Sequence, residues 1–132
     1  MAKNGQSSKL SNIIKAFDPS KLKLTNYDDL IYKEFKQHFK NISIERLNEQ
    51  DFKSEISKAK WRPFCNYYKG KIDEFNFGTL LRIDCNKDYS KENTILVTRI
   101  QFYAVEIARN RQELNKLHLN KEPQDQDDSQ ER

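Results

Sequence analysis

The chain has 132 residues, a formal net charge of +4 at neutral pH and charged side chains at 33% of its positions. This length suits one domain rather than several. No stretch reaches the roughly 20 apolar residues of a membrane-spanning helix, and the first ten residues lack the apolar segment of a secretory signal. We therefore expect a cytoplasmic protein without membrane contact, with the nucleus as a second compartment.

The thiols and imidazoles are too few and too scattered for a metal site. Cys65 and Cys85 are the only cysteines, and His38 and His118 are the only histidines. A structural zinc site needs four such ligands at close spacing, and disulfides need an oxidising compartment. We expect two buried, reduced thiols and neither metal nor cofactor.

Composition divides the chain into three parts. Residues 1–9 are small and polar, which predicts a flexible N-terminus. Residues 10–117 carry most of the apolar side chains and predict a single helical domain. Residues 118–132 are acidic and contain a proline, which predicts a disordered tail. Lysine and glutamate alternate in most segments, as on a solvated surface, so no specific nucleic-acid partner is expected.

The first part of the domain favours two helices. Leu10 to Phe17 predicts a short helix that ends before Pro19, because the residue before a proline avoids helical dihedrals. The apolar spacing from Tyr27 to His38 predicts a longer one. Asp28 falls in its first turn, where a helix N-terminus favours negative charge.

The middle of the chain predicts two more helices. The first runs from Phe52 to Lys60, and Trp61 and Pro63 mark a break and a restart. The second continues to about Phe75, although Gly70 weakens it.

Thr79 to Cys85 alternates as a strand would, but no partner strand is evident. We expect a helical turn followed by a loop. Gly78, between aromatic and apolar residues, favours a helix C-cap with a positive φ.

The last helix is expected over Thr94 to Leu117, with apolar residues on nearly every side, as in a buried helix. The sequence therefore predicts an all-α fold, a small orthogonal bundle of about five helices with a buried C-terminal helix and at most a minor strand.

Polar residues interrupt this last helix. Arg99, Tyr103, Glu106 and Asn110 share one stripe at helical spacing. Buried charge is costly unless it is paired. One interpretation is an internal arginine–glutamate network that includes Arg82, and the other is a polar groove for a client peptide. The two are compatible if the network lines the rim of the groove.

A cluster of aromatic and basic residues surrounds Trp61 and Arg62. On a helix, such spacing favours core packing. Contact with a protein client and stacking on single-stranded RNA are the alternatives.

Nothing in the sequence indicates an enzyme. No nucleophile has a neighbouring base, and Gly5, Gly70 and Gly78 stand too far apart for a glycine-rich phosphate loop.

Five blocks carry a resemblance to a known family. They are KLKLT (21–25), KWRPFCNYY (60–68), FNFGTLLR (75–82), ENT (92–94) and RIQFYAVEIARNR (99–111). In this order, from about Asp18 to Asn115, they resemble the polysaccharide biosynthesis domain-containing protein family.

The resemblance implies a small cytosolic protein of eukaryotes that is a dedicated chaperone of translation elongation factor 1-alpha. It implies action, without ATP, on the GTP-binding domain as that domain leaves the ribosome, with the ribosome or nascent-chain-associated factors as further partners. The candidate client-binding residues are Trp61, Arg62, Phe77, Gly78, Arg82, Arg99, Glu106, Arg109, Asn110 and Arg111.

Two alternatives stay open. The first is a general interaction module for another partner, such as a ribosomal or RNA-bound complex. The second is an enzyme of polysaccharide synthesis, which would need carboxylates or a metal to hold a nucleotide sugar.

Overall fold

The computed structural model describes residues 22–115. The helix expected at Leu10 to Phe17 and both terminal segments lie outside these residues. The elements in chain order are α2 (Asp28–His38), α3 (Gln50–Lys53), α4 (Glu55–Tyr67), β1 (Gly78–Arg82), a 3-10 turn (Lys91–Asn93), β2 (Thr94–Thr98) and α5 (Arg99–Arg111).

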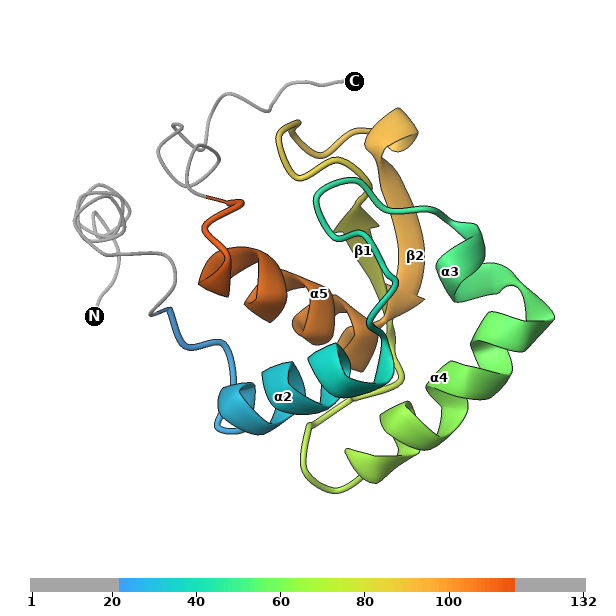
Figure 1. Cartoon of the computed structure of the whole chain (residues 1–132), viewed down its shortest axis with the longest axis vertical. Coiled ribbons are helices and arrows are strands. Elements are labelled where there is room, and N and C mark those ends of the chain that lie inside the picture. Colours follow the sequence, from blue (N-terminus) through green and yellow to red (C-terminus); the bar gives the residue numbers. More distant parts are fainter. Residues whose placement is uncertain (1–21, 116–132) are drawn as a thin grey trace.

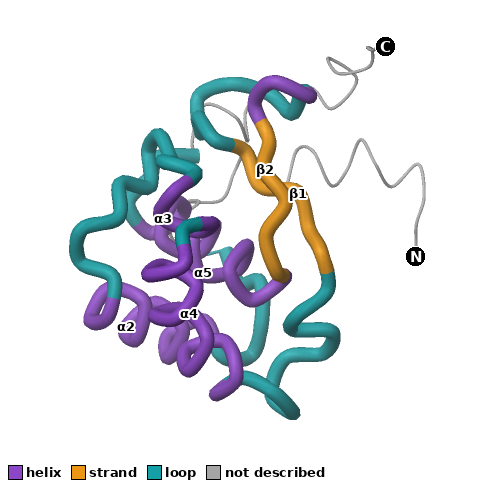
Figure 2. Tube along the Cα trace, turned by 90° about the vertical axis from the view of Figure 1, so that its right-hand side faces the viewer, coloured by secondary structure: helices purple, strands orange, loops and turns teal. Residues whose placement is uncertain are grey.

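The helices lie on one side of a two-stranded antiparallel ribbon in Figure 2, and Figure 1 shows α2 and α5 toward one flank of the ribbon and α3 and α4 toward the other. α5 lies at the centre and contacts α2, β1 and β2. Ile100, Ala104 and Val105 of α5 are completely buried, so this helix is the apolar centre on which the other elements pack.

The all-α prediction is wrong, because two segments expected as helix or loop form a β-hairpin. β1 pairs with β2, with Leu80 opposite Leu96 and Leu81 opposite Ile95. β2 has the sequence TILVT, whose β-branched residues suit a strand. Ile95 and Val97 point into the core, whereas Leu96 is exposed. The alternation from Thr79 to Cys85 was thus a strand signal whose partner lay within the expected last helix.

Two smaller corrections concern α4 and Gly78. α4 runs through Pro63 without a break and ends at Tyr67, before Gly70, whose φ of +84° suits a glycine. Trp61 and Phe64 are both buried, and their packing holds the helix together across the proline. Gly78 begins β1 and is not a C-cap; Gly70 is the one glycine with positive φ among the described residues.

A capping box sets the start of α5. The Gln101 backbone N–H donates to Thr98 Oγ1 at 3.3 Å, and the Thr98 backbone N–H donates to the Gln101 side chain at 2.9 Å. This reciprocal pair ends β2 at Thr98. The helix therefore begins five residues later than the sequence predicts.

Between Leu22 and Asn115, no helix has the length and apolar character needed to cross a membrane.

Replacing Thr98 with alanine should remove the side-chain acceptor at the start of α5. We expect the free energy of unfolding in urea to fall by about 1 kcal/mol. Ser43→Ala, at an exposed position, is the control and should change the free energy by less than about 0.5 kcal/mol. Equal stability of the two variants would show that the cap does not set this boundary.

Candidate partner-binding surface

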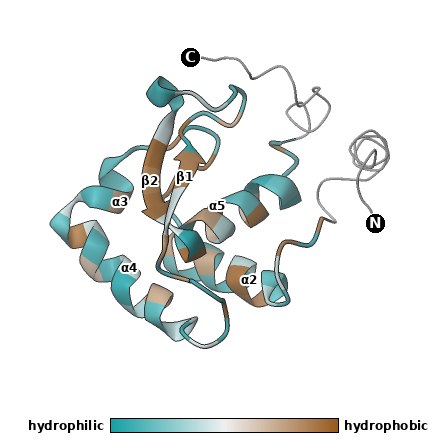
Figure 3. Ribbon diagram, turned by 180° about the vertical axis from the view of Figure 1, so that it is seen from behind, coloured by the Kyte–Doolittle hydropathy of each residue, from teal (hydrophilic) through white to brown (hydrophobic). Residues whose placement is uncertain are grey.

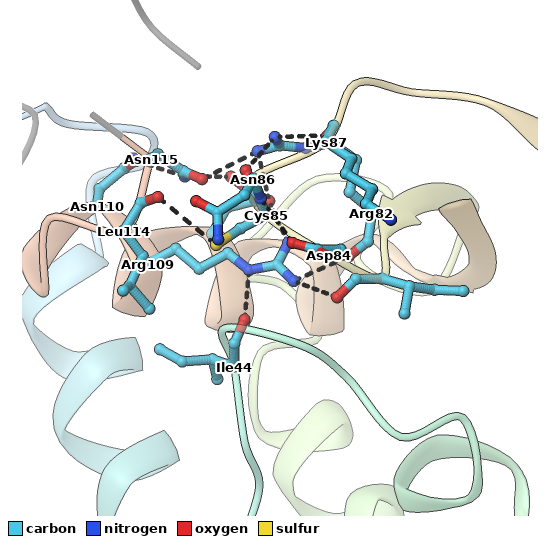
Figure 4. A network of polar contacts seen from close by, with 12 residues as sticks. Ile44, Arg82, Asp84, Cys85, Asn86, Lys87, Arg109, Asn110, Leu114 and Asn115 are labelled. Carbon is cyan, nitrogen blue, oxygen red and sulfur yellow. Dashed lines mark hydrogen bonds and ion pairs between the residues drawn. The ribbon is translucent and has the colours of Figure 1, made fainter. Parts of the chain in front are cut away.

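Arg109 lies at the centre of a polar network and is completely buried. Its Nε donates to the Ile44 carbonyl at 2.7 Å, and one terminal nitrogen donates to Glu106 at 3.0 Å. The other terminal nitrogen donates to the carbonyls of Arg82 and Ile83, at 2.9 and 3.1 Å (Figure 4). One side chain thus joins α5 to the end of β1 and to the segment that follows α2.

Arg82 occupies the other side of Glu106. It is 2% exposed, and its NH2 nitrogen lies 3.8 Å from Glu106 Oε2. It donates to the Cys85 carbonyl at 2.8 Å and to the Asn115 side chain at 2.9 Å. Asn115 in turn donates to Glu106 and Asn110, each at 2.8 Å. The network therefore holds two guanidinium groups and one carboxylate, and its other acceptors are backbone carbonyls and the side-chain oxygens of Asn110 and Asn115.

Burial lowers the pKa of Arg109, and the negative charge of Glu106 opposes that shift. Burial also raises the pKa of the neighbouring Cys85 thiol, although Arg109 and Arg82 counteract it. Since Arg82 and Arg109 are shielded from solvent, the geometry is that of the internal network rather than of an open groove.

Trp61 belongs to the aromatic core. It is 2% exposed, and its ring stacks on Phe39 with centroids 3.9 Å apart. Phe52 and Phe64 each lie 5.4 Å away, and the indole N–H donates to the Asp51 carbonyl at 2.9 Å. This arrangement is core packing, as the helical spacing favoured.

Arg99 and Arg111 lie on the surface and outside this network. Arg99 forms an ion pair with Glu74, with 3.5 Å between a terminal guanidinium nitrogen and Glu74 Oε1. Arg111 donates to Asp29 at 2.7 Å and lies over the Tyr32 ring. The structure therefore does not bring all the candidate residues together.

Three large apolar side chains are exposed at the hairpin: Leu80 of β1, Leu96 of β2 and Phe77 directly before β1, which are 53%, 56% and 55% accessible. We call them the hairpin face. Leu80 and Leu96 are directly opposite each other, and Figure 3 shows hydrophobic colour along both strands. A Cβ at Gly78 would approach Leu96 Cδ1 to 3.2 Å, so the glycine leaves room for this leucine.

A groove of about 450 Å³ adjoins the hairpin face and shares Leu96 with it. Lys53, Lys58 and Arg62 stand along it, and no aspartate or glutamate is among its lining residues. Burial raises the pKa of the Cys65 thiol in this groove to about 11, against a smaller opposing effect of the Thr98 hydrogen bond. The groove is thus apolar and basic, with a protonated thiol in its wall.

Among the described residues, no three histidine, cysteine or acidic side chains come together as metal ligands. The candidate site is therefore the hairpin face with its basic groove. It includes four of the sequence candidates, namely Trp61, Arg62, Phe77 and Gly78. Sequence reasoning missed Leu80 and Leu96. Had the hairpin been recognised, the alternation of side chains along its two strands would have placed both leucines on one face.

The model of the PBDC1 protein family matches residues 2–120 of the chain. The chain belongs to the PBDC1 protein family. The resemblance carried by the five sequence blocks to the polysaccharide biosynthesis domain-containing proteins is thereby confirmed.

Curated relatives come from animals and fungi. Human Protein PBDC1 is 52% identical over 104 residues, which are 79% of this chain and 45% of the human protein. A Schizosaccharomyces pombe homologue is 48% identical over 100 residues, which are 73% of this chain and 68% of the homologue. The chain spans about half the length of the human and mouse relatives, 45% and 52%.

A Saccharomyces cerevisiae protein whose solution structure was solved by NMR has the same fold. The TM-score is 0.74 at 36% identity, and the match covers 89% of this chain and 83% of the yeast chain. The fold of this chain is therefore shared with a yeast protein of known structure.

Replacing Arg109 with methionine should leave Glu106 with one cationic partner and remove the side-chain donor from the carbonyls of Ile44 and Arg82, whereas the Ile83 carbonyl keeps the Leu47 N–H. We expect the free energy of unfolding to fall by about 3–5 kcal/mol, the cost of breaking a buried ion pair. Arg99→Met, which breaks an exposed pair, is the matched control and should cost less than about 1 kcal/mol. Urea denaturation measures both, and equal losses would contradict the buried-network account.

Proposed function

We propose that this protein is a non-enzymatic, ATP-independent chaperone of the cytoplasm. Its client is the nascent GTP-binding domain of translation elongation factor 1-alpha, whose folding it supports. Membership of the PBDC1 family supports the client assignment through the resemblance described above. The observation that carries the proposal for this chain is the exposed hairpin face beside a basic groove.

Exposure of the hairpin face to water costs free energy. Each of Phe77, Leu80 and Leu96 is more than half exposed, and apolar area gains about 25 cal/mol per Å² when it leaves water. Contiguous exposed apolar residues with a polar surround are typical of protein-interaction surfaces. A client segment with exposed apolar side chains would cover them.

The groove adds a charge preference to this surface. Lys53, Lys58 and Arg62 line it; Lys58 also lies 3.9 Å from Glu55, and Lys53 donates to the Leu96 carbonyl. A partner segment that combines apolar with acidic side chains suits such a surface. These cations favour encounter and orientation more than affinity, because exposed pairs contribute little.

An unfinished GTP-binding domain has the matching property. Without nucleotide and Mg²⁺, the contacts that order its switch segments are missing. Its parallel sheet requires distant strands to pair, so apolar segments stay exposed while it forms. Nucleotide binding favours the finished domain, and by mass action a chaperone specific for the unfinished state then loses its client. No energy source is needed for this cycle.

The test measures binding of the full chain to elongation factor 1-alpha in nucleotide-free and GTP–Mg²⁺ forms. We expect binding to the nucleotide-free form and release on addition of GTP and Mg²⁺. The double variant Leu80→Ser/Leu96→Ser should weaken binding at least about tenfold, because it removes two apolar contacts. Ile56→Ser is the matched control, since Ile56 is 84% exposed and lies outside the groove lining.

Equal binding to both nucleotide states would contradict the release mechanism. Equal weakening by Ile56→Ser would contradict the assignment to the hairpin face. An affinity that falls steeply with salt and is insensitive to the leucine variants would instead indicate phosphate contacts with an RNA-bound partner.

A further inference from the structure

The outer edge of β2 lies open beside the basic groove. In Figure 1, β2 is the strand of the ribbon nearer α3 and α4, and Leu96, Val97 and Thr98 are among the residues that line the groove. The sheet has two strands, so within residues 22–115 no third strand covers this edge. An open edge presents unpaired N–H and C=O groups with which another extended chain can pair.

The pairing register shows which backbone groups of β2 face this edge. The Ile83 N–H donates to the Asn93 carbonyl in the register of the hairpin, and hydrogen-bonded pairs alternate with non-hydrogen-bonded pairs along an antiparallel ladder. Leu80 and Leu96 are three positions further along, so they form a non-hydrogen-bonded pair. The N–H and C=O of Leu96 therefore point away from β1, toward the open edge. The capping box already uses the Thr98 N–H, so the free edge is short and centred on Leu96.

Lys53 already occupies one of these two groups. Its ammonium donates to the Leu96 carbonyl from the end of α3, at the surface of the protein. A lysine at a strand edge discourages unspecific pairing. A carboxylate of a partner would compete with the carbonyl for this ammonium, because a hydrogen bond between ionised groups is stronger. An acidic partner would thus release the Leu96 carbonyl for pairing with a third strand.

A strand added at this edge would direct its side chains alternately to two surfaces. On one side of the sheet they would continue the apolar hairpin face next to Leu96. On the other side they would enter the groove, whose lining includes Lys53 and Arg62. Arg62 is exposed and forms no ion pair with another described residue. The two surfaces therefore suit a segment in which apolar and acidic residues alternate.

We propose that the client segment binds as a third, extended strand along the outer edge of β2. Its backbone exchanges hydrogen bonds with the N–H and C=O of Leu96, as in other complexes formed by strand addition. Its apolar side chains lie on the hairpin face, and its acidic side chains pair with Lys53 and Arg62 in the groove. The identity of the client rests on the proposed function, whereas the extended conformation and the alternating composition follow from the edge of β2.

A short peptide tests the pairing without the client. The full chain, labelled with ¹⁵N, is titrated with acetyl-Val-Glu-Val-Asp-Val-amide, whose alternating side chains match the two surfaces. The Leu96 amide hydrogen should exchange with solvent at least about tenfold more slowly in the complex, because it gains an acceptor. The Leu80 amide, which points toward the opposite edge of the hairpin, is the internal control and should keep its exchange rate.

Two changes in the peptide separate the backbone from the charge. A peptide with the same side chains and every amide nitrogen methylated should bind at least about tenfold more weakly, because it cannot donate to the strand edge. The peptide acetyl-Val-Lys-Val-Lys-Val-amide keeps the backbone donors and should bind at least about threefold more weakly, because it meets like charges in the groove.

A matched pair of variants tests the groove cation. Arg62→Gln should weaken binding of the acidic peptide at least about twofold, since it removes an exposed positive charge. Lys69→Gln removes an exposed charge outside the groove lining and should leave binding unchanged. Equal effects of the two variants would contradict the placement of the acidic side chains.

The inference is overturned by unchanged exchange at Leu96 under saturating peptide, by slowed exchange at Leu80 instead, by equal binding of the methylated peptide, or by no binding of the acidic peptide at millimolar concentration. The proposed function fails separately. Elongation factor 1-alpha that binds without slowing exchange at Leu96 would refute the added strand and leave the chaperone function standing. Slowed exchange with the peptide and no binding of elongation factor 1-alpha would refute the client and leave the pairing site.

Discussion

The structure depends most on how the chain satisfies the buried guanidinium of Arg109. This group carries a full charge into the protein interior, and a lone buried charge would be prohibitive. It meets Glu106 on its own helix and backbone carbonyls at Ile44, Arg82 and Ile83. The residues that satisfy Arg109 therefore come from three separate segments, and the position of α5 relative to the hairpin is fixed by hydrogen bonds.

The same network allows the hairpin to be small. A two-stranded ribbon is marginally stable by itself, and here its inner side packs on α5. Beyond the end of β1, the Leu47 N–H donates to the Ile83 carbonyl, and the Cys85 N–H donates to the Glu45 carbonyl. These two backbone bonds extend the pairing, and Arg109 supplies further donors where the pairing of β1 with β2 stops. With the ribbon held in this way, Leu80 and Leu96 can remain on its outer side. The buried network and the exposed apolar surface are thus two consequences of one arrangement.

The sequence predicted the helices better than the hairpin. The apolar spacing that predicts α2 is a local sequence signal. The burial of α5 is also predicted locally, from the apolar residues on all sides of the helix. The hairpin depends on a pairing between Thr79–Cys85 and Thr94–Thr98, and the second segment is apolar enough to continue a helical pattern. The side-chain stripe indicated an arginine–glutamate network with Arg82 and Glu106, but its Arg99 pairs with Glu74 instead, and the central arginine is Arg109, which lies outside the stripe. Its carbonyl partners at Ile44 and Ile83 belong to irregular segments, and no residue pattern encodes them. The exposure of Leu80 and Leu96 follows from the strand register, so it cannot be predicted from the sequence before the two strands are recognised.

The central claim is that Arg109 and Glu106 act together in locking α5 to the hairpin. A double-mutant cycle with Arg109→Met, Glu106→Gln and the combined variant, followed by urea unfolding, isolates their coupling. The account predicts a favourable coupling of at least about 1.5 kcal/mol, because each residue left alone is a buried group that has lost its nearest charged partner. Additivity within about 0.5 kcal/mol would mean that the two residues contribute independently, and it would contradict the account.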